Sequence, residues 1–568
     1  MERLKNTAAS LIVERRVVVL SVFFILTLVS ALLISRVNVN YDFNEYLPDD
    51  SPTKIGAARL QEQFPPSATF NLMFRGLREI EKPAIAHWLA SIPYVDNVSF
   101  EQGDERFERD GHTLYVITIG VDAFSPEGEA VVDAINEEFR GYDKVLSGPL
   151  TMPVNMIFIM VPAAIILLVV LFVMCKSWFE PVIFIISIMA AIILNMGTNV
   201  VFDSVSDVTV SIAAILQVVL CMDYSIMMFN RYRQEKALTE DRKAAMKSTL
   251  RKSFVTISSC SITTIVAMVM LVFMSFSLGM DLGLVLAKGV FLSLVCILTI
   301  TPGLILIFDN VIEKTAKRAP QFKMEKLAAF AYSARYAIAA FFLVLFAASF
   351  LLRGSTLVTY TVGGYDEVYQ VFPPDNPIVV LYENSDEANI AGLVGGWEEN
   401  QHVESVLSVS TLMGAMARPA QFTAFISDDN APALGGAMDQ MREALAQFVG
   451  SEYSRLVINT NFTDESEEAF AFIQGISHDL AGALDGESFI TGSLAFAYEM
   501  NNSFPSELAF ITILTVISVF ITVAVAFRSI VIPMILVSVI QCSIFVTMGS
   551  TFFQGMSIIY LALLIVQC

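Results

Sequence analysis

The sequence predicts a polytopic α-helical membrane protein that carries two large α+β domains outside the cytoplasm. Of the 568 residues, 55% are hydrophobic and only 16% are charged, whereas soluble domains carry about 25% charged residues. The apolar residues gather in runs of about 20, the length that crosses a bilayer as a helix. The acidic residues behind the net charge of −21 gather instead in two polar stretches, residues 36–153 and 353–506.

The apolar runs give the predicted membrane spans. They are residues 17–35, 154–175, 180–202, 206–230, 254–276, 284–309, 335–352, 507–527 and 530–550. The first span is long and has no small-residue cleavage site after it, so we expect a signal anchor and not a cleaved signal peptide. Residues 557–568 are apolar but too few to cross, and we expect them to form an incomplete tenth helix.

The orientation of the spans follows from the placement of Lys and Arg, which concentrate in cytoplasmic loops. Basic residues precede the first span and fill the loops after the fourth and sixth predicted spans, at about 231–252 and 314–326. All these segments lie on one side if the N-terminus is cytoplasmic. The sequence thus predicts a multi-pass protein of the cytoplasmic (inner) membrane, with both polar stretches outside the cytoplasm.

The layout of one span, a large outer domain and a group of spans occurs twice, and the second copy starts near residue 335. Short matches occur in the same order in both copies. Gly148-Pro149-Leu150 corresponds to Gly492-Ser493-Leu494, and Met196-Gly197-Thr198 corresponds to Met548-Gly549-Ser550. Parallel repeats of this kind are common in transporters.

Each outer domain shows a strand and helix pattern of the order βαββαβ, which is typical of a ferredoxin-like fold. In the first domain the predicted strands are 67–74, 95–101, 113–121 and 143–147, and the helices are 77–91 and 126–139. In the second domain the strands are 377–382, 403–409, 454–460 and 487–491, and the helices are 386–399 and 465–484. An insertion at about 410–452 separates its halves and is predicted to be helical at 433–449.

These patterns give a predicted domain organisation. The segments are 1–35 (N-terminus and first span), 36–153 (first outer domain), 154–309 (second to sixth spans), 310–334 (cytoplasmic loop), 335–352 (seventh span), 353–506 (second outer domain) and 507–568 (eighth and ninth spans and the incomplete tenth).

Composition argues against several classes of function. The six cysteines all lie in apolar segments, so we expect the outer domains to fold without disulfides. The four histidines form no metal-ligand spacing and no phosphate-binding loop is visible, so we expect no metal, no cofactor, no ATPase and no enzymatic activity. The acidic balance argues against nucleic acid as a partner.

Ionisable residues inside a predicted span are costly and are therefore functional candidates. Asp223 lies in the fourth span, about 12 Å from Arg231 at about 1.5 Å per residue. Hydrocarbon disfavours the charged carboxylate, which would let Asp223 take up and release protons. Tyr224 and Gln217 share a helix face, and we expect them to support a hydrogen-bond path beside Asp223. The alternative is that Asp223 only bonds a neighbouring helix.

The fifth and sixth spans contain further polar candidates. The fifth span carries a hydroxyl patch that could support proton movement or only mediate helix contacts; its residues are Ser258, Ser259, Ser261, Thr263 and Thr264. Lys288 in the sixth span and Asp281 just before it are weaker candidates, because a lysine near the outer interface can simply extend its ammonium to water.

On these features the chain resembles the RND (resistance–nodulation–division) superfamily and, within it, the MMPL (mycobacterial membrane protein large) branch, whose membrane part is related to the sterol-sensing region of Patched-like proteins. The features are the one-plus-five span grouping, the ferredoxin-like outer domain, Asp223-Tyr224, and Asp281-Leu282-Gly283 leading into Lys288-Gly289.

The resemblance implies an exporter of lipids or other hydrophobic compounds that is driven by the proton-motive force, an efflux by proton antiport. It implies that Asp223 takes the proton and that Tyr224 assists. The family also uses an Asp-Tyr pair in the tenth span, which would fall past Cys568, so we expect this chain to be a fragment of a longer protein. A membrane lipid or hydrophobic small molecule is the expected partner, with a homo-oligomer or envelope partners also compatible with the sequence.

Other functions remain open on the residues. The same scaffold would serve a sterol- or lipid-sensing binding protein without transport. It would also serve an envelope scaffold whose acidic outer domains dock other proteins. An auxiliary subunit of a protein export machine shares this architecture, but such a chain normally holds one half, and the repeat here argues against it.

Overall fold

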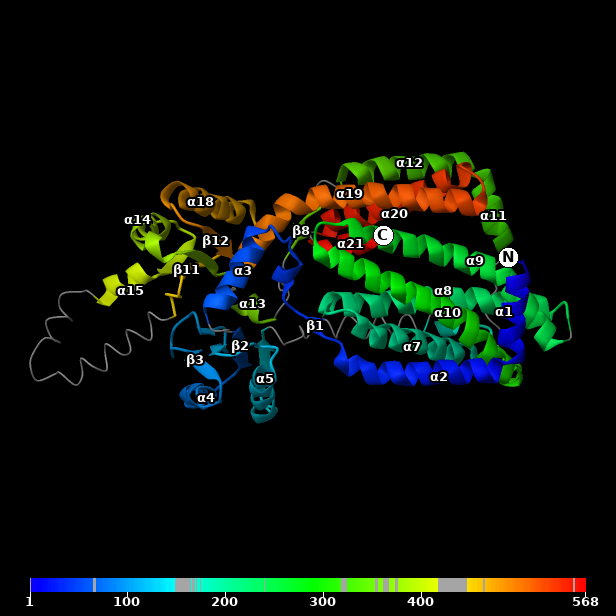
Figure 1. The fold of residues 1–568 in the computed structure, drawn as a ribbon, viewed down its shortest axis with the longest axis horizontal. Coiled ribbons are helices and arrows are strands. Elements are labelled where there is room, and N and C mark those ends of the chain that lie inside the picture. The colour runs from blue at the N-terminus through cyan, green and yellow to red at the C-terminus, as the bar shows by residue number, and fades with distance from the viewer. Residues whose placement is uncertain are drawn as a thin grey trace, which may run out of the picture. The chain divides into compact units, whose positions relative to one another are not determined.

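The computed structural model describes residues 2–64, 68–148, 165, 169, 171–173, 175–239, 241–317, 324–352, 356–360, 367–372, 376–416, 447–462, 465–554 and 557–567. The chain divides into two compact units, each contributed by both repeats (Figure 1). The first, which we call the membrane unit, contains Met1–Tyr46, Pro162–Val358 and Pro505–Cys568. The second, the outer unit, contains Leu47–Val161 and Thr359–Phe504.

In the described residues, eight helices are long and apolar enough to cross a membrane. They are α2 (Arg16–Leu33), α7 (Glu180–Thr198), α8 (Asp207–Lys236), α9 (Arg242–Met270), α10 (Ser277–Lys314), α12 (Arg335–Leu352), α19 (Ser493–Phe527) and α20 (Val531–Gln554). These helices coincide with eight of the predicted spans. The remaining span, 154–175, lies mostly outside the described residues.

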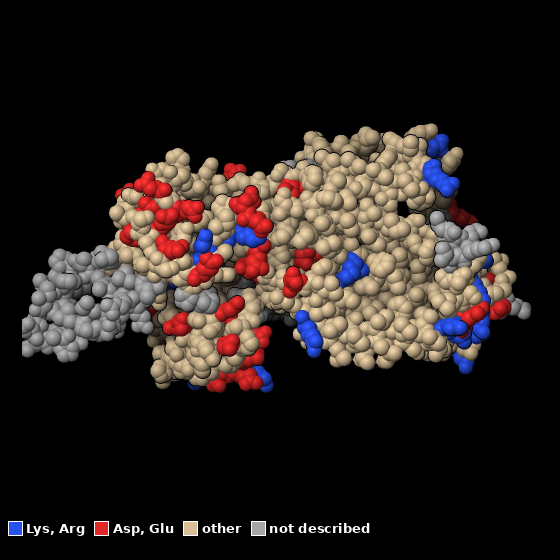
Figure 2. Space-filling view, in the orientation of Figure 1, with Lys and Arg blue, Asp and Glu red and all other residues tan. Residues whose placement is uncertain are grey.

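The spans differ in how much of their surface is covered by protein. In the apolar 18-residue stretch of α10, 61% is buried inside the protein, whereas in the corresponding stretches of α2 and α12 only 6% is buried. α10 packs against α7, α8 and α9, which makes it the central helix of this group. Most surface of the membrane unit visible in Figure 2 carries no charge, as contact with hydrocarbon requires, while acidic side chains crowd the outer unit.

Short elements complete the membrane unit. A parallel pair of two-residue strands, β1 and β7, joins the segment after α2 to the segment before α8. The other elements are α1 (Glu2–Glu14), η1 (Ile34–Arg36), β1 (Val39–Asn40), η2 (Phe43–Tyr46), η3 (Asn199–Val201), β7 (Val205–Ser206), η4 (Leu271–Phe273), α11 (Met324–Ser333), β13 (Ile558–Ile559) and α21 (Tyr560–Gln567).

The first sheet of the outer unit has the strand order β3-β5-β2-β6, with every neighbouring pair antiparallel. Ser125 caps α5 because its hydroxyl accepts the Gly128 N–H at 3.1 Å. The elements close to the predicted bounds are β2 (Ala68–Arg75), α4 (Glu81–Leu89), β3 (Val95–Ser99), β5 (His112–Ile119), α5 (Pro126–Glu138) and β6 (Lys144–Ser147). A short strand that was not predicted, β4 (Glu108–Arg109), pairs with β5.

The second sheet repeats this topology with the order β10-β11-β9-β12, again antiparallel throughout. Ser466 caps α18 in the same manner. The predicted helix at 433–449 lies mostly outside the described residues. The elements are β9 (Ile378–Glu383), η6 (Asn384–Asp386), α14 (Glu387–Glu398), β10 (Val403–Leu407), α15 (Val409–Met416), β11 (Tyr453–Thr460), α18 (Glu467–Ala483) and β12 (Ser488–Thr491).

Two short helices, which the sequence analysis did not predict, are exchanged between the sheets. α3 (Pro52–Gln63) follows the first span but packs against β12 of the second sheet, where Phe64 is buried with Leu381 and Tyr453. α13 (Glu367–Val371) comes after β8 (Val358–Thr359) and packs against β2 and β6 of the first sheet. Each sheet is therefore covered on one side by a segment from the other repeat.

Candidate functional site

Asp223 lies in the membrane-spanning part of α8 and its side chain is exposed. Among the described residues it makes no hydrogen bond or ion pair. The alternative that Asp223 simply bonds the hydroxyl groups of α9 is therefore not what the structure shows. A carboxylate at this depth faces either hydrocarbon or another protein segment.

Tyr224 has the opposite environment from its neighbour. Its side chain is only 4% exposed and lies against Ser261 and Thr264 of α9. The hydroxyl groups of Ser225, Ser258 and Ser261 are buried and have no hydrogen-bond partner of good geometry in the described residues. Buried hydroxyl groups without protein partners are the usual ligands of internal water. The interface between α8 and α9 beside Asp223 is thus polar and unsatisfied.

The other threonines of the hydroxyl patch are used within their own helix. Thr263 donates to the Ser259 carbonyl at 2.9 Å and Thr264 to the Cys260 carbonyl at 3.3 Å. Such bonds satisfy the hydroxyl locally, as helix threonines often do. Of the five patch residues, Ser258 and Ser261 have buried hydroxyl groups without a hydrogen bond of good geometry in the described residues. Thr263 and Thr264 already have one, and Ser259 contributes its carbonyl to Thr263.

Gln217 makes no hydrogen bond to Asp223 or Tyr224 in the described residues, and the hydrogen-bond path beside Asp223 stays a prediction. The Gln217 side chain is 1% exposed and its amide donates to the Gly289 carbonyl at 3.0 Å and to Ser293 Oγ at 3.2 Å. Its Oε1 accepts from Asn195 Nδ2 at 3.1 Å. The seven-residue spacing places Gln217 on the buried side of α8 with Tyr224, but Gln217 contacts α7 and α10.

Lys288 joins the same buried network. Its ammonium donates to the Asn195 carbonyl at 3.1 Å and to Asn199 Oδ1, and lies 5.0 Å from the centre of the Phe202 ring. Sequence reasoning missed Asn195, which is fully buried. The sequence did contain an indication of this contact, because an asparagine inside an apolar run needs a hydrogen-bond partner on another helix.

Asp281 has a local structural contact at the start of α8. Its carboxylate accepts the backbone N–H of Ser206 at 2.8 Å, which satisfies a free amide at the helix start. Burial, together with the nearby Asp281 charge, raises the pKa of the Tyr46 phenol above its ordinary range. Asp281 thus ties the segments at this end of α8 and α10 together.

A second set of charges, which the sequence analysis also missed, lies toward the other ends of α7 to α10. Asp309 is 1% exposed and its carboxylate pairs with Lys236 at 2.6 Å and Arg242 at 2.8 Å, and accepts from the Tyr232 hydroxyl at 3.1 Å. The buried Glu180 pairs with Arg233. The described residues contain no group of three or more His, Cys, Asp or Glu side chains that could hold a metal ion.

The fold is that of a multi-pass α-helical membrane protein in which polar and ionisable side chains are buried between the apolar helices. The sequence profile of the MMPL family matches residues 107–330 and 381–567, which is more than half of the chain. This chain therefore belongs to the MMPL family.

One curated relative is the membrane protein ActII-3 of Streptomyces coelicolor, which is 32% identical over 102 residues. The match covers 18% of this chain and 14% of that protein. It therefore supports the family over a limited stretch.

Proposed function

We propose that this chain drives the export of lipids or other hydrophobic compounds across the cytoplasmic membrane with the proton-motive force. The observation that carries the proposal is Asp223, an exposed carboxylate at hydrocarbon depth beside the buried Tyr224. Membership of the MMPL family supports the choice of a hydrophobic substrate.

The coupling follows from the cost of charge in the membrane. A charged Asp at the centre of a span costs about 2.5–3.5 kcal/mol on insertion scales. Protonation of Asp223 removes this cost and allows the exposed side of α8 to approach an apolar neighbour. Loss of the proton favours separation or water at the same place. A proton thus changes the helix packing around α8 during each transport cycle.

Tyr224 and the unsatisfied hydroxyl groups of Ser225, Ser258 and Ser261 supply the access route. Water held by these groups would connect Asp223 to one side of the membrane. Lys288 and the Asn195–Gln217 pair instead hold α7, α8 and α10 together on the other side of α8. The moving part would then be the α8–α9 interface.

The outer unit would carry the substrate. The order and antiparallel pairing of both sheets support two ferredoxin-like, porter-like domains. Because α3 and α13 are exchanged between them, a displacement of one sheet pulls on a segment of the other repeat. Such a pair of domains can pass an apolar molecule outward from the membrane.

The distribution of basic residues supports a cytoplasmic N-terminus and outer domains beyond the cytoplasmic membrane. The proton gradient is the proposed energy source, and no bound cofactor is needed for this mechanism. Homo-oligomerisation and envelope partners remain proposals of the same kind.

The test compares Asp223→Asn with a matched control, Asp203→Asn, in the full protein. Asp203 is an exposed carboxylate in the loop before α8. Transport of a labelled hydrophobic compound into everted membrane vesicles and the substrate-dependent release of protons from them are measured at equal membrane abundance. We expect Asp223→Asn to reduce both activities to background and Asp203→Asn to leave them unchanged. Full export by Asp223→Asn would instead show that Asp223 is not the proton relay, whereas a wild-type protein that exports nothing would favour a lipid-sensing or scaffold role.

A further inference from the structure

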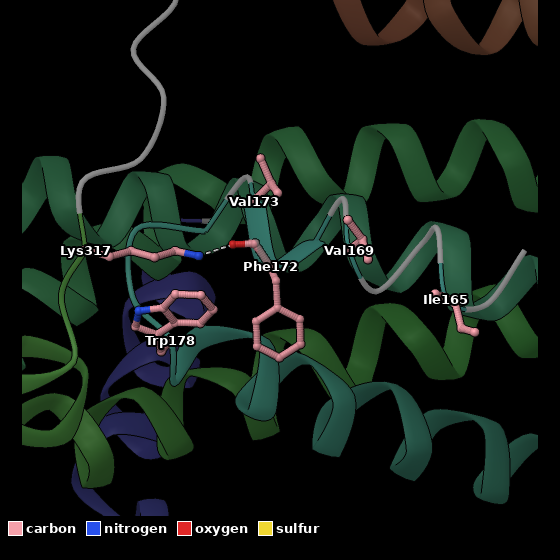
Figure 3. A pocket seen from close by; sticks show the side chains of 6 residues that line it. All are labelled: Ile165, Val169, Phe172, Val173, Trp178 and Lys317. Atoms are coloured by element: carbon pink, nitrogen blue, oxygen red, sulfur yellow. Dashed lines mark hydrogen bonds between the residues drawn. The ribbon is translucent and has the colours of Figure 1, made fainter. Parts of the chain in front are cut away.

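A pocket on the membrane unit does not include Asp223 in its lining and has no place in the proposed transport mechanism (Figure 3). Its volume is about 310 Å³ and its lining is almost entirely apolar. The lining side chains are Ile165, Val169, Phe172, Val173, Trp178 and Lys317. One lysine at the end of an apolar trough is a combination that suits an amphiphile with an acidic headgroup.

The charged end of the pocket is held firmly. The Lys317 backbone N–H donates to the Lys176 carbonyl at 2.8 Å, and the Trp178 N–H donates to the Thr315 carbonyl at 3.1 Å. The hydroxyl groups of Ser177 and Thr315 are 2.7 Å apart. These contacts fasten the segment after α10 to the turn before α7, so the positions of Lys317 and Trp178 are set by the backbone.

The Lys317 ammonium is held in place by two contacts that leave part of its hydrogen-bonding capacity unused. It lies 4.0 Å from the centre of the Trp178 ring, within range of a cation–π contact. It also donates to the Phe172 carbonyl, as the dashed line in Figure 3 shows. An ammonium has three donors, so it can still bond an anionic oxygen at the mouth of the pocket.

The apolar wall has the dimensions of an acyl-chain segment. Ile165, Val169, Phe172 and Val173 have helical spacing, which places them on one side of a helix. Ile165 and Phe172 are about 10 Å apart along the axis at about 1.5 Å per residue. Val169 is 55% exposed and Ile165 is 54% exposed. The wall thus leads away from Lys317, from Val173 past Val169 to Ile165, as Figure 3 shows.

We propose that this pocket binds one anionic phospholipid of the cytoplasmic leaflet, with its phosphate at Lys317 and an acyl chain along the apolar wall. Basic pockets between spans on the cytoplasmic side are suited to acidic headgroups, and an indole ring favours the membrane interface. Lys176, exposed on the adjoining turn, strengthens the positive field. The inference rests on the orientation stated under Proposed function.

The test measures lipid binding to the full protein by native mass spectrometry, with phosphatidylglycerol and phosphatidylcholine of identical chains. We expect Lys317→Gln to weaken phosphatidylglycerol binding about fivefold, which corresponds to about 1 kcal/mol per basic residue near an anionic membrane. Phosphatidylcholine binding should not change. Lys317→Arg should keep the preference for phosphatidylglycerol over phosphatidylcholine, and Val169→Asn should weaken the binding of both lipids.

Lys176→Gln is the matched control, because it removes a neighbouring positive charge that does not line the pocket. An equal loss in Lys176→Gln and Lys317→Gln would show a diffuse surface effect and overturn the proposal, as would an unchanged preference in Lys317→Gln. Displacement by glycerol phosphate alone would assign the site to a soluble anion. Binding needs no proton gradient, so Asp223→Asn should bind the lipid normally, and this outcome separates the pocket from the transport mechanism.

Discussion

Both repeats contain a contact between a glycine of one helix and a serine of the preceding span, but the two backbones approach more closely in the first repeat than in the second. In the first repeat Gly197 of α7 meets Ser30 of α2, and a Cβ on Gly197 would lie 2.0 Å from the Ser30 carbonyl oxygen. In the second repeat Gly549 of α20 meets Ser349 of α12, and a Cβ there would lie 3.7 Å from the Ser349 carbonyl oxygen. The sequence match Met-Gly-Thr/Ser therefore marks one tight and one ordinary contact.

The first repeat also has the more buried polar contact between helices. Asn195 of α7 is fully buried and bonds Gln217 of α8. The corresponding position in α20 is Thr547, which is exposed and bonds the Ser543 carbonyl of its own helix. In the apolar 18-residue stretch of α7, 50% is buried inside the protein, against 17% in that of α20. A repeat in sequence preserves the helix order, while close packing depends on how many neighbours each helix has.

The largest predicted effect concerns the ion pairs of the first repeat. Asp309→Asn leaves the cations of Lys236 and Arg242 beside a neutral amide, and breaking a buried pair in this way costs about 3–5 kcal/mol. Thermal unfolding of the full protein in detergent should show a clear loss of stability. Glu313→Gln is the control, since Glu313 pairs with the same two cations but its side chain is 54% exposed. We expect about 0–1 kcal/mol for it, and equal losses would contradict the importance of burial.

The glycine contacts give the next prediction. Gly197→Ala must push α2 and α7 apart, and overpacking of this kind costs about 1–3 kcal/mol. Gly549→Ala meets only ordinary van der Waals contact and should change the unfolding free energy by about 0.5 kcal/mol or less. Unfolding midpoints of the two variants, measured side by side, test the difference. Similar losses would mean that both repeats are packed equally tightly.

The smallest effect is a pH dependence in the first outer domain. Burial lowers the pKa of Lys144 to about 8, although its ammonium donates to the Ile135 carbonyl at 2.8 Å. The unfolded chain, with an ordinary lysine pKa of about 10.4, binds more protons than the fold between pH 8 and 10.4. Stability should therefore rise with pH across this window, and the cost of the charge is fully present below pH 8.

Lys144→Met should remove this rise, which denaturant unfolding of the full protein at pH 7.5 and 9.5 would show. The effect is small because the side chain is partly open to solvent. The second sheet supplies the comparison, since β12 begins with Ser488 where β6 begins with Lys144. A Ser488→Ala variant should leave the pH dependence unaltered. A persistent rise in Lys144→Met would assign it to other groups.

Much of the secondary structure followed from local pattern. The spans are long apolar runs, and strands such as β5 and β11 alternate in burial as their sequences do. α19 begins earlier than the predicted span because its first turns are polar, for example at Glu499 and Asn501. The helix α3 was not predicted because its sequence is only weakly apolar and the strand that it packs against, β12, lies in the other repeat.

The sequence by itself determined that Asp223 stands inside a span, that Lys288 follows it on another, and that the layout repeats. These facts depend on the order and hydropathy of neighbouring residues. Only the tertiary structure decided that Gln217 turns to Asn195 and not to Asp223, and that Asp309 is surrounded by cations. Those contacts join residues far apart in the chain, and which side of a helix meets which neighbour is set by the packing of all its neighbours together.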